Sequence, residues 1–245
     1  MSQPYLSIII PAYNEAERIP ETLLDMDKRL DGVEYSYEIV VVSDGSTDNT
    51  AEVVNNMKKV VRNLKLIDLH ENQGKGGTVR QGMLLSAGTI RLFTDADNST
   101  SIDQFEKMMP LFKEGRDVVI GSRTIAGAQL DPPESVFRRC AGKALNLVVQ
   151  ALLLPGIWDT QCGFKAFTED AAKKVFMASS IPGWGFDVEV LTLAKKMGYT
   201  IQEVPVHWVN DIRSHVRMSA GLQFLRDISI IRWRLWQGHY DPPQS

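Results

Sequence analysis

The stretch Arg91-Leu92-Phe93-Thr94-Asp95-Ala96-Asp97-Asn98-Ser99 places two carboxylates directly after a short apolar run. We expect residues 90–94 to form a buried strand whose end delivers Asp95 and Asp97 beyond the sheet edge, where open α/β sheets bind ligands. Residues two apart on a strand share a side, and two such carboxylates repel unless a cation or a donor-rich ligand lies between them. Oxygen ligands of this kind suit Mg²⁺ or Mn²⁺. The alternative interpretation is a solvated acidic turn.

Strand-like and helix-like segments alternate on both sides of this stretch, which predicts an α/β fold with a doubly wound, mostly parallel sheet. The expected strands cover residues 6–10, 38–42, 64–69, 90–94 and 117–120. The expected helices cover residues 15–30, 49–62, 78–87 and 101–114. Each polar loop follows the end of a strand, so we expect these loops to converge on one edge of the sheet.

The pattern changes after Arg123. Residues 124–135 are predicted to be a loop, residues 163–167 and 200–206 strands, and residues 135–154, 168–178, 186–197 and 219–237 helices. The apolar stretch from Ala144 to Trp158 is shorter than the roughly 20 residues that span a bilayer, and no signal peptide is visible.

The composition is that of an ordinary globular protein, with 44% hydrophobic and 23% charged residues in a chain of 245. A net charge of −3 gives no basic field, so nucleic acid is not an expected partner. The two cysteines, Cys140 and Cys162, indicate neither a zinc site nor a disulfide framework.

Two further loops carry residues that could bind a ligand. Asp44 precedes Gly45 at the end of an expected strand, where its carboxylate could accept hydrogen bonds from a base or a ribose, or could simply stabilise a turn. The glycine-rich loop around Lys75, residues 70–77, runs into a helix and would let the backbone approach an anion. It lacks the spacing of a phosphate-binding Walker loop, and no dinucleotide fingerprint follows the first strand.

The motifs SIIIPAYNE (7–15), SDGS (43–46), NQGKG (72–76) and TDAD (94–97), in this order, resemble glycosyltransferase family 2 of GT-A fold. DTQCGFKAF (159–167) and GFDVE (185–189) resemble its dolichyl-phosphate β-glucosyltransferase, or polyprenyl-phosphate glycosyltransferase, branch, which is related to the dolichyl-phosphate mannose synthases. The resemblance covers residues 6–238 and implies an inverting hexose transfer, most simply from UDP-glucose, to a dolichyl or undecaprenyl phosphate.

The same resemblance assigns roles to individual residues. Asp97, with Asp95, would bind Mg²⁺ or Mn²⁺, and Arg123 would meet the acceptor phosphate. The nucleotide-sugar contacts that it implies are Pro11, Ala12, Tyr13, Glu15, Ser43, Asp44, Lys75, Asp95 and Ala96. It also implies Arg138 or Arg139 as a partner of Arg123. Arg213 and Arg217 are further candidates to close over the diphosphate, and the alternative is that they are solvated loop charges. Three positions depart from the pattern: Ser43 replaces a second aspartate, Ser99 an amide ligand, and His215 lies near an expected lysine.

The acceptor that the resemblance implies, a lipid monophosphate, is already an anion and so needs a general base less than an alcohol would. Asp187 remains a candidate catalytic residue, as a base or as a group that orients the sugar, and so does Glu189; alternatively, both only cap or decorate a helix. Alternative functions are a mannose synthase that uses GDP-mannose, a family 2 transferase that acts on a sugar hydroxyl, and a nucleotidyltransferase on a similar sheet.

Two predicted helical segments, residues 144–154 and 219–237, are apolar and carry basic or aromatic residues. Such helices can lie in the membrane interface, which predicts peripheral contact with the cytoplasmic face of a membrane. Packing on the catalytic core is the alternative. We expect a GT-A catalytic domain over residues 1–210, with a nucleotide-binding half (1–123) and an acceptor half (124–210). Residues 211–245 would then form a C-terminal loop and an amphipathic interfacial helix. The related eukaryotic enzymes carry an N-terminal anchor that is not expected here.

Overall fold

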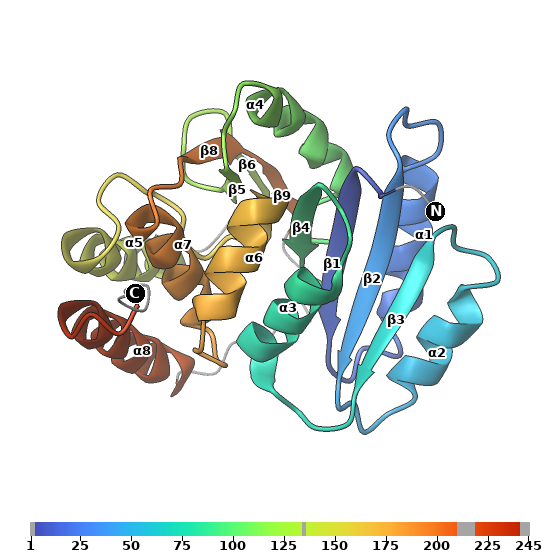
Figure 1. The fold of residues 1–245 in the computed structure, drawn as a ribbon, viewed down its shortest axis with the longest axis horizontal. Coiled ribbons are helices and arrows are strands. Elements are labelled where there is room, and N and C mark those ends of the chain that lie inside the picture. The colour runs from blue at the N-terminus through green and yellow to red at the C-terminus, as the bar shows by residue number, and fades with distance from the viewer. Residues whose placement is uncertain (1–2, 134–135, 210–218, 241–245) are drawn as a thin grey trace, which may run out of the picture.

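The computed structural model describes the backbone of residues 3–133, 136–209 and 219–240, and the side chains of these residues except 136–141 and 219–220. Its centre is a seven-stranded sheet of order β3-β2-β1-β4-β7-β5-β8 (Figure 1). The strands are β1 (Leu6–Ala12), β2 (Tyr37–Asp44), β3 (Leu64–Leu69), β4 (Ile90–Thr94), β5 (Val118–Ser122), β7 (Phe164–Thr168) and β8 (Ile201–Pro205). All neighbours are parallel except β7, which runs antiparallel to β4 and β5. The predicted fold class is confirmed.

Helices cover both faces of the sheet because its strands are apolar on both faces. Ile8 and Ile10 of β1 face α1 (Ile19–Arg29), α2 (Thr50–Met57), the 3₁₀ helix η1 (Ile102–Lys107) and α4 (Met109–Lys113). Ile9 faces the opposite layer. That layer comprises α3 (Gly74–Leu85), α5 (Val136–Leu152), α6 (Glu169–Ala178), α7 (Phe186–Lys196) and α8 (Ser219–Trp236).

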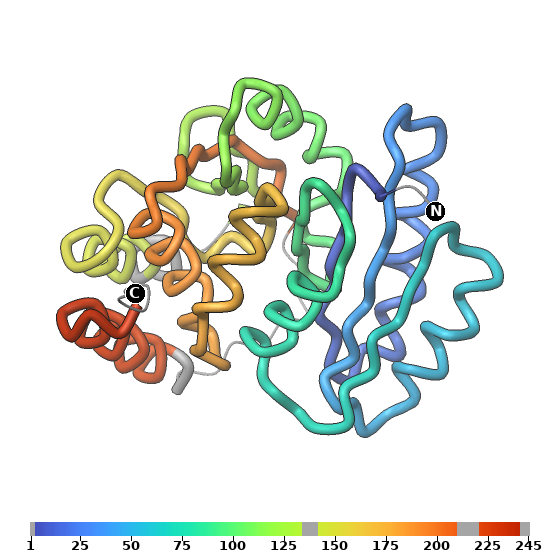
Figure 2. Tube along the Cα trace, viewed as in Figure 1, coloured from blue at the N-terminus to red at the C-terminus, as the bar shows by residue number. Residues whose placement is uncertain are grey.

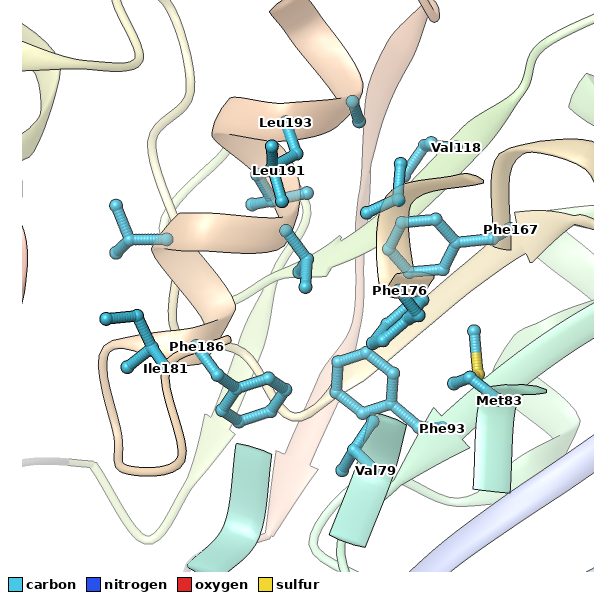
Figure 3. Close-up of a cluster of buried hydrophobic side chains, with 14 of the residues drawn as sticks. Val79, Met83, Phe93, Val118, Phe167, Phe176, Ile181, Phe186, Leu191 and Leu193 are labelled. Carbon is cyan, nitrogen blue, oxygen red and sulfur yellow. The ribbon is translucent and has the colours of Figure 1, made fainter. Parts of the chain in front are cut away.

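Four phenylalanines anchor the second layer. The ring of Phe93 on β4 packs against those of Phe167, Phe176 and Phe186, with centroid separations of 5.6 to 6.4 Å (Figure 3). These rings join β4, β7, α6 and α7 immediately before the acidic turn that follows β4. The turn therefore begins from a rigid position.

Three local predictions differ from the structure. The predicted helix over residues 101–114 is split into η1 and α4, with Pro110 in the first turn of α4. The segment predicted as a loop before β7 contains a short strand, β6 (Gln129–Asp131), which pairs with β9 (His207–Val209). The third difference is that α3 begins at Gly74, inside the predicted glycine-rich loop.

The chain path brings the two halves into one sheet (Figure 2), since β7 and β8 from the C-terminal half lie on either side of β5. The boundaries predicted for the catalytic domain and its halves stay predictions. Among the described residues, no helix has the length and hydropathy needed to cross a membrane.

Candidate active site

The two aspartates of the opening motif lie in a fixed turn after β4. Asn98 adopts a left-handed backbone with φ of 54°, and the Ser99 amide donates to Asp97 Oδ1 at 3.0 Å. The Thr22 hydroxyl of α1 donates to the carbonyl of Ala96 at 2.6 Å. The turn is thus held at both its centre and its end, which presents the Asp95 and Asp97 carboxylates at the sheet edge.

Lys75, in the first turn of α3, is the cation that faces these carboxylates. Its Nζ lies 2.6 Å from Asp95 Oδ1 and 4.8 Å from the centroid of the Trp184 ring. Gly74 and Gly76 flank it because the neighbouring chain is too close for side chains. A Cβ on Gly74 would lie 2.6 Å from the Pro182 carbonyl oxygen, and one on Gly76 would lie 2.2 Å from that of Ile181.

The charges at this edge are not balanced. Burial, and next the charge of Asp95, raise the pKa of Asp97 above its ordinary value. Burial opposes the ammonium form of Lys75, but Asp95, Asp187 and Asp97 outweigh it and raise the pKa of Lys75. An acidic group with a raised pKa gains from added positive charge, so this edge favours a cation or a donor-rich ligand.

Asp187, at the start of α7, forms an ion pair with a second lysine. Lys165 of β7 is fully buried, and its Nζ lies 2.5 Å from Asp187 Oδ1 and donates to the Cys162 carbonyl. Burial raises the pKa of Asp187 although Lys165 and Lys75 oppose the rise. Two lysines and three aspartates therefore act on one another at the end of β4 and the start of the antiparallel strand β7.

Arg123, after β5, is held by a bidentate ion pair. Its Nε and Nη2 donate to the two carboxylate oxygens of Asp159 at 2.8 and 2.9 Å, and its guanidinium lies 4.8 Å from the Trp208 ring. Burial disfavours the Asp159 charge, but Arg123 outweighs burial and lowers the pKa of Asp159. Glu203 in turn accepts from the Trp158 and Asp159 amides at 2.9 and 3.0 Å.

One loop connects this arginine with the acidic turn. Residues 159–163 begin with the partner of Arg123 and end with Gly163, where a Cβ would lie 2.0 Å from Asp95 Oδ2. Within the loop, the Cys162 carbonyl accepts from Lys165, and burial raises the pKa of the Cys162 thiol to about 12. The thiol is therefore a neutral packing group.

The expected nucleotide contacts from the first two loops lie beside each other. Asn14, with φ of 54°, accepts from the Thr47 amide at 2.8 Å, which joins the loop after β1 to the loop after β2. Asp44 is buried and accepts from the Gln73 amide at 2.7 Å, just before Lys75. Glu15 is in an ion pair with Arg18 at 2.5 Å. Tyr13 is half-exposed, whereas Ala12 and Ser43 are buried and Pro11 is the penultimate residue of β1.

Four predicted site arginines lie outside the description. The side chains of Arg138 and Arg139 and the whole of Arg213 and Arg217 fall among the residues that the structure does not describe, as does His215.

The carboxylates after β4 are suitable ligands for a divalent cation. Among the described residues, no group of three or more histidine, cysteine or acidic side chains is arranged so that it could hold a metal ion. Mg²⁺ and Mn²⁺ do not need one, because such ions commonly take one or two carboxylates and share their other positions with water and substrate phosphates. The raised pKa of Asp97 indicates the same preference for added positive charge. The residues present therefore fit a cation held jointly with a phosphate ligand.

Sequence reasoning missed several residues of this edge and misjudged one. No role is predicted for Lys165, Asp159 or Trp184, although the first two lie in the motif DTQCGFKAF (159–167) and Trp184 directly precedes GFDVE (185–189). Glu189 was a candidate base, yet it is completely buried and accepts hydrogen bonds from Ser180, Ile181 and Tyr240, so that proposal is wrong. The available signal was helical geometry. Residues two apart on a helix differ in direction by about 200°, so Asp187 and Glu189 do not face the same site.

Comparison with known proteins identifies the family of this chain. Residues 7–176 match the glycosyl transferase family 2 domain. The chain belongs to glycosyl transferase family 2. A dolichyl-phosphate beta-glucosyltransferase of Dictyostelium discoideum is 38% identical over 247 residues, covering 96% of this chain and 76% of that protein. The human dolichyl-phosphate beta-glucosyltransferase is 34% identical over 254 residues, covering 98% of this chain and 78% of that protein.

Solved structures share the fold of this family 2 member at low identity. Mannosyl-3-phosphoglycerate synthase from Rubrobacter xylanophilus has a TM-score of 0.71 at 14% identity, covering 99% of this chain and 77% of its own. Glucosyl-3-phosphoglycerate synthase from Mycobacterium tuberculosis, solved with Mn²⁺, UDP and phosphoglyceric acid, has a TM-score of 0.68 at 19% identity, covering 99% and 80%. The predicted membership of glycosyltransferase family 2 is confirmed, and the chain is a glycosyltransferase.

Proposed function

We propose that this glycosyltransferase moves glucose from UDP-glucose to a polyprenyl phosphate, with inversion and with the help of Mg²⁺ or Mn²⁺. The observation that carries the proposal is the 34 to 38% identity to dolichyl-phosphate beta-glucosyltransferases over more than nine-tenths of the chain. The arrangement of Lys75, Asp95 and Asp97 supports it, because this charge pattern favours a cation and a diphosphate together.

The donor would lie along the loops that follow β1, β2 and β4. Asp44, Tyr13 and Glu15 are candidates for the base and ribose, and Lys75 for the diphosphate. Asp97, with Asp95, would hold the cation, which when bound supplies a Lewis acid that neutralises the leaving diphosphate. Engagement of a cation by Asp95 would leave the Lys75 ammonium free to turn toward the diphosphate.

The acceptor phosphate would meet Arg123. Asp159 holds this guanidinium in a fixed plane, and planar guanidinium donors suit the geometry of phosphate oxygens. An acceptor oxygen forms the new bond to the anomeric carbon while the bond from that carbon to the diphosphate breaks and UDP leaves. Because the attacking oxygen carries no proton, the reaction needs alignment more than it needs a base.

The lipid part of the acceptor would approach from α5 and α8. These helices expose Leu147, Leu152, Trp233 and Trp236, and a groove of ≈ 340 Å³ between them also contains Arg232. Exposed tryptophans beside arginine suit the boundary between acyl chains and anionic headgroups. We therefore propose peripheral contact with a membrane, at its cytoplasmic face.

The decisive experiment supplies UDP- and GDP-sugars with a short polyprenyl phosphate, in Mn²⁺, Mg²⁺ or EDTA, and measures glycolipid formation. We expect turnover with UDP-glucose and loss of turnover in EDTA. A preference for GDP-mannose would support the mannose synthase alternative, and transfer to free sugars alone would support a hydroxyl acceptor. Undiminished turnover in EDTA would contradict the cation.

Membrane contact has its own test, co-sedimentation with vesicles of neutral or anionic phospholipid. We expect binding to anionic vesicles that falls about tenfold in the double variant Trp233→Ala and Trp236→Ala, because each change removes a large apolar surface. Leu85→Ala, which removes an exposed apolar side chain from α3, is the matched control. Protein that stays in the supernatant with both vesicle types would contradict the proposal.

A further inference from the structure

A short segment between α6 and α7, residues 180–185, packs directly against the start of α3. The Pro182 carbonyl accepts from the Gly76 amide at 2.8 Å, and the Trp184 ring lies 4.8 Å from Lys75 Nζ. Gly74, on the other side of Lys75, is also closed off by Pro182. The backbone of Lys75 is thus set, before and after the residue, by this segment.

Glu189 determines the conformation of the segment. Its Oε2 accepts from the Ser180 and Ile181 amides at 2.9 and 2.8 Å, and its Oε1 accepts from the Ser180 hydroxyl at 3.0 Å. The side chain is fully buried on α7 and its oxygens are occupied. It therefore has no access to a substrate and can act only through the residues that it binds.

The remaining partners of this carboxylate come from α8 and the residues just after it. The Tyr240 hydroxyl donates to Glu189 Oε1 at 2.7 Å, and Arg234 Nη1 lies 3.5 Å from the same oxygen while donating to the Ser180 hydroxyl at 2.6 Å. Burial, with Glu189 beside it, raises the pKa of Tyr240 to about 12, so its hydroxyl stays a donor at neutral pH.

A second contact from α8 reaches the end of the segment. Asp227 accepts from the Gly185 amide at 3.2 Å, and a Cβ on Gly185 would lie 2.4 Å from the Cβ of Asp227. Residues 180–185 are therefore enclosed between α8 and α3, an arrangement that can be followed in Figure 1. A displacement of α8 would be passed to the backbone beside Lys75.

We propose that Glu189 is a positioning residue of the donor site, and that through it the C-terminal helix α8 sets the affinity for the nucleotide diphosphate. The inference rests on the proposed function in taking Lys75 as a diphosphate contact. Ser180, Pro182 and Trp184 form the connection from Glu189 to Lys75. No group in this connection needs to touch the substrate except Lys75 itself.

The test measures UDP binding to the full chain in Mn²⁺ by calorimetry, together with KM and kcat for UDP-glucose. We expect Glu189→Gln to raise the UDP Kd about tenfold and Tyr240→Phe about threefold, because each weakens hydrogen bonds to a charged group. KM should rise in parallel while kcat stays within about twofold, since no reacting atom is displaced. Tyr199→Phe is the matched control, because its hydroxyl donates at 2.5 Å to Asp170, whose carboxylate is exposed.

A double-mutant cycle with Lys75→Met separates positioning from general loosening of the fold. If the effect passes through Lys75, adding Tyr240→Phe to Lys75→Met leaves the UDP Kd unchanged. Additive effects in this cycle would overturn the proposal, as would a UDP Kd within twofold of wild type in both Tyr240→Phe and Arg234→Met. Those two variants decide the matter if Glu189→Gln does not fold. A wild-type chain that binds neither UDP nor GDP would instead contradict the proposed function.

Discussion

At the end of the sheet where β1 and β2 begin, the Glu38 carboxylate accepts from the Ser7 hydroxyl at 2.5 Å, from the Ala87 amide at 2.8 Å and from Lys65 at 2.7 Å. At the opposite end, Asp97 accepts from the Ser99 amide, and Asp95 beside it faces Lys75. Burial acts on both carboxylates, yet the pKa of Glu38 is lowered by its partners whereas the pKa of Asp97 is raised. The internal partners of Glu38 thus offset its burial, whereas those of Asp97 do not.

Arg91 shows the same completeness at the structural end. This buried guanidinium donates to the carbonyl of Met83 at 2.6 Å and to that of Gly88 at 3.3 Å, and its Nη2 lies 3.3 Å from Glu169. Lys75, at the other end, is one-fifth exposed, and within the described part of the chain it has one carboxylate partner, Asp95, and one aromatic neighbour, Trp184. The difference predicts opposite consequences when charges are removed at the two ends.

The largest effect is expected at Asp97. Asp97→Asn should lower glycosyl transfer by at least about a thousandfold, because the stabilisation that a bound cation gives to the leaving diphosphate is worth several kcal/mol. The same change should leave the protein as stable as wild type or more stable at neutral pH, since the raised pKa means that the folded state disfavours the Asp97 charge. Urea unfolding and a radiolabelled transfer assay measure the two quantities. A large loss of stability in Asp97→Asn would contradict the difference between Asp97 and the structural carboxylate Glu38.

Glu38→Gln should give the reverse result. We expect a loss of about 2 kcal/mol of unfolding free energy, roughly thirtyfold in the folding equilibrium, because hydrogen bonds to a charged group are broken. Transfer activity at 25 °C should remain at the wild-type level. Lys65→Met is a milder companion, since the lysine is largely exposed. Activity lost in proportion to that of Asp97→Asn would contradict a purely structural role.

Asp187 tests the difference between structural and ligand-binding carboxylates. It lies at the same end of the sheet as Asp95 and Asp97, but it is in an ion pair with the buried Lys165. With a phosphate acceptor, Asp187→Asn should reduce kcat by about tenfold or less, since a general base typically contributes 10² to 10⁴ and none is needed here. A loss of about a thousandfold or more would favour a hydroxyl acceptor. Assays on polyprenyl phosphate and on free sugar acceptors distinguish these outcomes.

The smallest effect concerns pH. The partners of Glu38 hold its pKa below the ordinary glutamate range, so its contribution to stability is complete above that range and is lost as the pH falls through the folded value. The difference in unfolding free energy between wild type and Glu38→Gln should therefore be constant near pH 7 and shrink below about pH 4. Urea unfolding at a series of pH values measures it, and a difference that grows toward low pH would contradict the assignment.

Alternation of apolar strands and polar loops was enough to predict the order of the first five strands of the sheet and the edge at which Asp44, Lys75 and Asp95 gather. The direction of β7 could not be predicted, because a short apolar strand packs equally well in either orientation. The start of α3 was missed since glycine disfavours helices, whereas here close packing against Pro182 requires glycine. The two lysine–aspartate pairs depend on contacts between distant segments, which local patterns do not contain.

The enclosure of residues 180–185 between α3 and α8 complicates any experiment that shortens the chain. A protein truncated before Ser219 would lose the exposed tryptophans of α8. It would also lose Asp227, Arg234 and Tyr240, whose hydrogen bonds hold residues 180–185 and Glu189 in place beside Lys75. Inactivity of such a truncation would thus be uninformative about lipid attachment. Substitutions confined to the outward side of the helix, at Trp233 and Trp236, keep the bracing residues in place and isolate the contribution of the bilayer.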